Sequence, residues 1–105
     1  MVKKELPIPD AALRDENSVE MLRVWIAEKK LICSIKVGMY QEGMNMAEER
    51  PWGIILADVT RHLANAMQDK YSKNPADTIA KIRAAFDKEL GAPTSKAEGE
   101  FVERH

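Results

Sequence analysis

Apolar and polar residues alternate with a period of two between residues 19 and 40, interrupted once by a polar run at residues 28–30. Such alternation is typical of strands with one buried face, so the segment predicts an antiparallel β-hairpin. Its register follows from parity, because a slip of one residue would set the apolar face of one strand against the polar face of the other. The predicted pairs are Leu22 with Ile35, Val24 with Cys33 and Ile26 with Leu31.

The second face of the predicted hairpin also carries apolar residues. Trp25 and Ile32 fall opposite each other on it, with Met21 nearby. An apolar group on a face turned away from the core needs a cover. A partner chain or the N-terminal arm could supply it, or the pair could stay exposed; the first possibility makes these three residues candidates for an interface.

Residues 51–70 change to the period of an α-helix. Their large apolar residues fall within a stripe roughly 120° wide at about 100° per residue. The stripe consists of Trp52, Ile55, Leu56, Val59, Leu63, Ala66 and Met67. We expect this stripe to cover the apolar face of the hairpin, with the helix starting within two residues of Pro51.

A second amphipathic helix follows with a specific start signal. Asn74 is a good N-cap, Pro75 suits the first helical position, and Asp77 lies near the positive end of the helix dipole. Its apolar residues repeat every three or four positions until Gly91 and Pro93 end the helix. These residues are Ile79, Ile82, Phe86 and Leu90.

The predicted fold class is therefore α+β, with an antiparallel hairpin followed by two helices (ββαα). Residues 1–105 form a single small domain in this interpretation, with an ordered core over 19–91. Residues 1–18 are predicted as an extended arm and loop, or alternatively with one helical turn at residues 9–13. Residues 92–105 are polar and predicted to be a flexible tail.

Composition narrows the functional classes. Sixteen basic and seventeen acidic residues give a net charge of −1, which argues against nucleic-acid binding. No apolar run is long enough for a membrane span or a signal peptide. The single cysteine, Cys33, excludes an internal disulfide and fits a reducing compartment, so we expect a cytoplasmic protein.

The predicted core is small for its chain length, and a two-stranded hairpin leaves both edges open. Association of two chains would enlarge the core and cover the open edges of the sheet. The sequence therefore predicts a homodimer in which the sheet is extended or covered by the second copy.

One polar group on the flank of the first helix is the only candidate for chemistry. Asp58, His62 and Asp69 return to nearly the same azimuth, with Asn65 close by and Trp52 at the head of the stripe. A carboxylate four residues from a histidine could orient the ring in a ligand site, or could be a plain surface pair. No motif for a metal, a cofactor or a catalytic nucleophile is present, and Cys33 is expected to pack in the core.

The chain also carries a recognisable set of segments. LRVWI at residues 22–26, PWGIILAD at 51–58 and RHLANA at 61–66 resemble a small bacterial family that is classed as a domain of unknown function. The resemblance covers about residues 5–93 and implies no activity, cofactor or site residue.

Two functional hypotheses follow from these patterns. The first is a non-enzymatic, self-associating cytoplasmic protein whose role is binding or assembly. The alternative is a small-ligand-binding protein or minor enzyme with a site around Asp58, His62 and Asn65.

Overall fold

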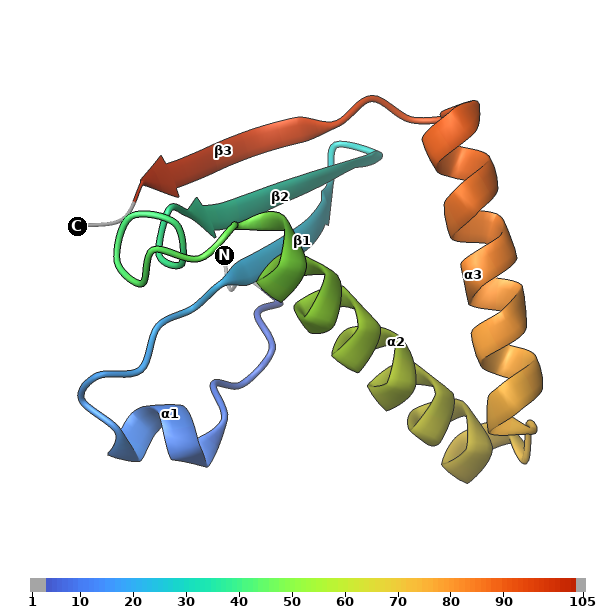
Figure 1. Ribbon diagram of the computed structural model, residues 1–105. Helices are drawn as coiled ribbons and strands as arrows, with labels where there is room; N and C mark the ends of the chain where they lie inside the picture. Colours follow the sequence, from blue (N-terminus) through green and yellow to red (C-terminus); the bar gives the residue numbers. More distant parts are fainter. Residues whose placement is uncertain (1–3, 104–105) are drawn as a thin grey trace.

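The computed structural model describes residues 4–103 and has an α+β fold (Figure 1). The order of elements is αββααβ, so the predicted ββαα core is flanked by one more element on each side. The elements are α1 (Asp10–Arg14), β1 (Leu22–Ala27), β2 (Lys30–Val37), α2 (Glu49–Tyr71), α3 (Pro75–Gly91) and β3 (Glu98–Glu103).

The hairpin of β1 and β2 is antiparallel and has the predicted register. Leu22 pairs with Ile35, and Val24 pairs with Cys33. The two residues of the turn, Glu28 and Lys29, both have positive φ (52° and 63°), as in a type I′ turn. Neither is the glycine or asparagine that this turn prefers, so the alternating pattern of the strands determined the register without help from the turn residues.

The sheet is mixed, which corrects the prediction of a purely antiparallel hairpin. β3 pairs in parallel with β2, in the order β1-β2-β3, and places Gly99 beside Cys33 and Phe101 beside Ile35. β3 lies within residues 92–105, which the sequence predicted as a flexible tail. The strand was missed because it has only two large apolar residues and no alternation; the open edge of β2 provides the backbone partners that define it.

Gly99→Ala is expected to detach β3 from the sheet. Gly99 has a φ of 131°, and a Cβ at this position would overlap the backbone carbonyl of Cys33. We predict faster amide hydrogen exchange in β2 and β3. The matched control is Gly91→Ala at the end of α3, where a Cβ meets nothing within 4 Å. Unchanged exchange in the Gly99 variant would contradict this role of the glycine.

Both long helices begin as their sequences predict. α2 starts at Glu49, which puts Pro51 in the first turn where its missing N–H is tolerated. α3 starts at Pro75, and the Asn74 side chain accepts a hydrogen bond from the Asp77 backbone N–H at 3.1 Å. A left-handed residue, Ser72 (φ 58°), ends α2 and reverses the chain direction between the helices.

The two helices pack on each other, and neither lies against the sheet. Their contact buries Ala64 of α2 and Thr78 of α3, which are 1% and 6% exposed. The expectation that α2 covers the hairpin is therefore wrong within one chain. Figure 1 shows the reason: the α2–α3 pair is joined to the sheet at both outer ends, through the β2–α2 loop and the α3–β3 link, and its tip points away.

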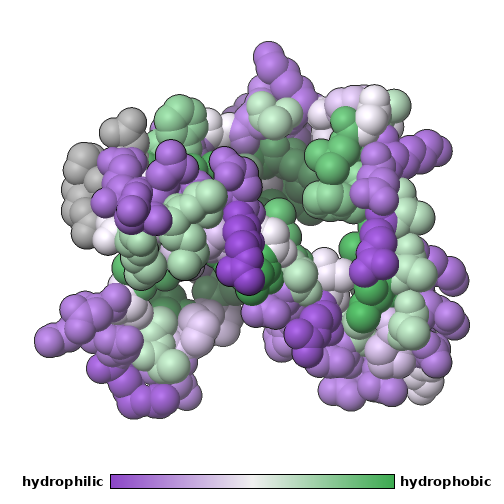
Figure 2. All heavy atoms as spheres, in the orientation of Figure 1, coloured by the Kyte–Doolittle hydropathy of each residue, from purple (hydrophilic) through white to green (hydrophobic). Residues whose placement is uncertain are grey.

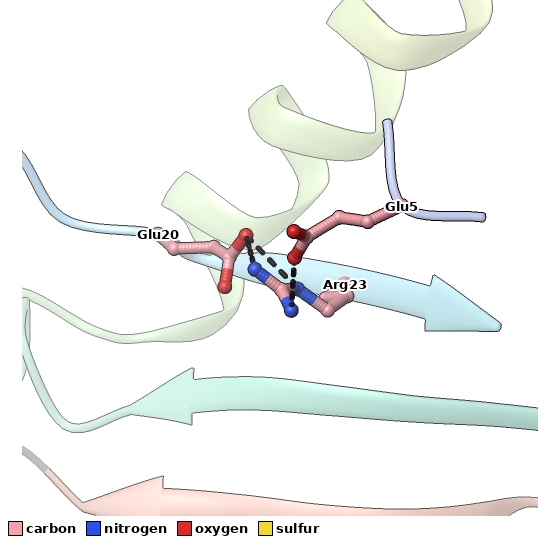
Figure 3. A network of polar contacts seen from close by, with 3 residues as sticks. All are labelled: Glu5, Glu20 and Arg23. Carbon is pink, nitrogen blue, oxygen red and sulfur yellow. Dashed lines mark hydrogen bonds and ion pairs between the residues drawn. The ribbon is translucent and has the colours of Figure 1, made fainter. Parts of the chain in front are cut away.

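The N-terminal arm lies along β1 and contains the short helix α1, close to the predicted alternative of one turn at residues 9–13. Arg23 of β1 holds the arm: its guanidinium contacts Glu5 at 2.7 Å and Glu20 at 3.0 Å (Figure 3). The hydrogen bond from Arg23 to Glu20 and the charges of both carboxylates raise the pKa of Arg23. The arm is thus fixed to the edge of the sheet by charge pairs at the surface.

Candidate functional site: two uncovered apolar surfaces

One face of the sheet is almost entirely apolar and is uncovered. Side chains alternate between faces along a strand, so the registers of both strand pairs place the apolar residues together. We call this the apolar sheet face; it consists of Leu22, Val24, Ile26, Leu31, Cys33, Ile35, Val37 and Phe101. Ile26 is 80% exposed and Phe101 is 69% exposed. The face is therefore open to solvent chiefly at Val24, Ile26, Leu31 and Phe101, while its other four residues are half-buried.

The other sheet face carries the residues that the sequence proposed for an interface. Trp25 and Ile32 pair across the two strands as predicted, and Met21 precedes β1. All three are half-buried. They share this face with charged residues, among them Arg23 and Lys36, so it is less apolar than its opposite. Their contact with a partner stays a prediction.

The second uncovered surface is the apolar stripe of α2. Successive residues of α2 are rotated by about 100° around its axis, so Ala57, Thr60 and Ala64 lie on the side next to the stripe. α3 packs on that side. The part of the stripe that is turned away from α3 is here called the α2 stripe. It consists of Trp52, Ile55, Val59, Leu63 and Ala66. Trp52 and Ile55 in it are half-buried, and its other three residues are exposed. Val59 is 45% exposed and Leu63 is 43% exposed, although helix amphipathicity marks both for burial.

The whole chain exposes far more surface than a compact protein of its size. Its accessible surface is 9287 Å², against about 6,000 Å² for a folded monomer of 11.9 kDa. The radius of gyration is 15.8 Å, against about 13 Å for a compact chain of this length. Figure 2 shows an opening between the helices and the sheet that is bordered by hydrophobic atoms. Both uncovered surfaces contribute to this excess.

The polar residues predicted as a ligand site lie on an exposed side of α2. Asp58 forms an ion pair with Arg61 at 3.7 Å, and no hydrogen bond or ion pair in the described chain joins it to His62. Asn65 and Asp69 are also exposed. Among residues 4–103 there is no group of three or more histidine, cysteine or acidic residues placed to hold a metal ion. A ligand at these residues stays a prediction.

The side chain of Trp52 is held by Glu48, a contact that was not predicted from the sequence. Its Nε1 donates a hydrogen bond to the Glu48 carboxylate at 3.1 Å, and the same carboxylate accepts bonds from the backbone N–H groups of Tyr40 and Gln41. These bonds, chiefly the one from Gln41, lower the pKa of Glu48 below its ordinary value of 4.5. Glu48 thereby fixes the β2–α2 loop to the first turn of α2.

Acidification is expected to release this loop. Because the folded state lowers the pKa of Glu48, its stabilising effect is complete above pH 4.5 and is lost as the pH falls through the folded-state pKa. We expect the Trp52 fluorescence to shift to longer wavelength below pH 4.5, measured in a Trp25→Phe background. The Glu48→Gln variant should lack this transition. An identical transition in that variant would assign the effect to another group.

Two apolar hollows were not anticipated from the sequence. One, of about 640 Å³, lies between the N-terminal arm and β1 and is lined by Leu6, Ile8, Leu13 and Trp25 among others. The other, of about 530 Å³, lies between α2 and α3 and includes Leu56, Ile82 and Phe86. Neither is lined by Asp58, His62 or Asn65. Both depend on contacts between distant segments, which periodicity does not reveal.

Comparison with known proteins identifies the family. Residues 5–94 match the family described as "Domain of unknown function (DUF5076)". The chain belongs to this family. No curated protein matches it. The family is thus uncharacterised, in agreement with the resemblance seen in the sequence.

A solved structure shares the fold of this DUF5076 protein. It comes from the photosynthetic bacterium Rhodopseudomonas palustrus CGA009 and is described as a "putative pyruvate dehydrogenase". The TM-score is 0.68 and the sequence identity is 23%, over 99% of this chain and 97% of the other. At this identity the similarity concerns the fold alone. In the part of the chain that the structure describes, neither α2 nor α3 combines the length and apolar character needed to cross a bilayer.

Proposed function

We propose that this DUF5076 protein is a non-enzymatic, self-associating cytoplasmic protein that acts in binding or assembly as a homodimer. The observation that carries the proposal is the excess of exposed surface, to which the apolar sheet face contributes Val24, Ile26 and Phe101 and the α2 stripe contributes Val59 and Leu63. Large exposed apolar patches mark association surfaces in soluble proteins. The single cysteine fits the cytoplasm, where thiols stay reduced.

The size of the excess supports a permanent dimer. The chain exposes 9287 Å², roughly 3,300 Å² more than a compact chain of its mass. Obligate dimers bury about 1,000 to 2,500 Å² on each partner. One partner of the same size can therefore cover most of the excess.

Multi-angle light scattering after size exclusion tests the proposal. We expect a mass of twice 11.9 kDa that persists down to micromolar protein. Added salt should leave the mass unchanged, because the proposed surfaces are apolar rather than charged. A mass of one chain at every concentration, with an intact circular dichroism spectrum, would overturn the proposal.

A further inference from the structure

We propose that, in the homodimer proposed above, the α2 stripe of each chain packs on the apolar sheet face of the other chain. The occupant of each surface is thus a second copy of this protein. The inference rests on the proposed function and specifies which surfaces meet. It follows from the geometry of one chain, in which both surfaces are present and neither covers the other.

The connections at both ends of the helix pair keep α2 away from its own sheet. At one end, the Glu48 carboxylate binds the loop after β2 and the Trp52 indole, which fixes where α2 leaves the sheet. At the other end, α3 continues into β3, which pairs with β2 along six residues. Figure 1 shows α2 and α3 as a V whose open end is attached to the sheet. To fold onto its own sheet, α2 would have to break one of these attachments.

The two surfaces match in size and in character. α2 has 23 residues and is about 35 Å long, while the eight residues of β2 extend over about 27 Å. No residue of the α2 stripe is charged, and none of the eight residues that define the apolar sheet face is charged; the register of β3 also sets Glu103 opposite Val37 at the end of the sheet. Exposure on the sheet face reaches 80% at Ile26. A helix from another chain would meet mainly apolar residues there.

A helix on a sheet covers more than other symmetric arrangements. Two sheets packed face to face would leave both α2 stripes exposed, and two stripes packed together would leave both sheet faces exposed. In the reciprocal arrangement a two-fold axis places each stripe on a sheet face, so both surfaces of both chains are covered at once. This arrangement would bury Val24, Ile26 and Leu31 of the sheet and Val59 and Leu63 of α2, which are exposed in one chain.

Disulfide trapping with the natural cysteine tests this arrangement. Cys33 lies in the middle strand on the apolar sheet face. Single cysteines are introduced one turn apart along the stripe, as Ile55→Cys, Val59→Cys and Leu63→Cys, and the proteins are oxidised with copper phenanthroline. Matched controls place the cysteine on the opposite side of α2, as Arg61→Cys and Asn65→Cys. Light scattering before oxidation verifies that each variant keeps the mass of the parent protein.

We expect at least one stripe cysteine to give a covalent dimer at several times the yield of the controls. Peptide mass spectrometry should identify a bond to Cys33, and Cys33→Ser should abolish it. A bond to Cys33 within one chain, seen as a monomer with altered mobility, would show that α2 covers its own sheet and would overturn the inference. Dimers without a bond from any stripe cysteine to Cys33 would overturn it while leaving the proposed function intact. Monomeric parent protein would overturn both.

Discussion

Leu63→Asp should convert the dimer into a monomer at micromolar protein. Leu63 lies in the α2 stripe and is 43% exposed in one chain, so the proposed interface would bury it. An aspartate there would place an unpaired carboxylate against the apolar sheet face, which costs several kcal/mol unless the group is neutralised. A loss of about 3 kcal/mol raises the dissociation constant by roughly two orders of magnitude. Sedimentation velocity across a dilution series measures the change.

Asn65→Asp is the matched control for this variant. It introduces the same side chain two residues away, on the exposed side of α2 opposite the stripe. We expect it to dissociate at the same concentration as the parent protein. Equal dissociation constants for the Leu63 and Asn65 variants would show that the α2 stripe lies outside the interface. The circular dichroism of both variants separates loss of association from loss of helix.

Ala64→Leu should destabilise the protein through the contact between α2 and α3. Ala64 is 1% exposed and lies on the side of α2 that packs against α3. Three additional carbon atoms have no space there, and overpacking of this kind costs about 1–3 kcal/mol. For a domain of about 100 residues, each kcal/mol lowers Tm by roughly 4–8 °C. Thermal unfolding followed by circular dichroism measures the loss.

Ala84→Leu makes the same change at an exposed position of α3. Because leucine is a good helix former, we expect its Tm to stay within about 2 °C of the parent protein. Both variants are compared at one protein concentration, since association shifts the apparent stability. A drop in Tm of the same size in both would assign the effect to added apolar surface rather than to the packing of the two helices.

The sequence predicted local structure correctly where that structure depends on residues close together in the chain. The hairpin register followed from the parity of its apolar residues, and all three predicted pairs are present. The start of α3 followed from Asn74 and Pro75, because capping is a matter of three or four residues. The family resemblance in segments such as LRVWI was likewise visible without a structure.

Periodicity fails where an element is defined by a distant partner. β3 has only Phe101 and Val102 as large apolar residues, and its strand conformation comes from pairing with the open edge of β2. The Glu48 carboxylate binds the backbone N–H groups of Tyr40 and Gln41, eight and seven residues earlier in the chain, a contact that periodicity does not indicate. The side chains of Asp58 and His62 share a flank of one helix, but a shared flank did not bring them into a hydrogen bond.

The sequence by itself determined which residues need burial: the apolar sheet face and the stripe of α2 are both evident from their periods. Only the tertiary structure decided that these two surfaces do not meet within one chain. The period of apolar residues shows which face of a helix or strand avoids water. It does not show how the loops between elements place that face relative to the rest of the chain. Here the fixed β2–α2 loop and the added strand β3 hold the helix pair away from the sheet, and in the proposed homodimer the second chain completes the burial.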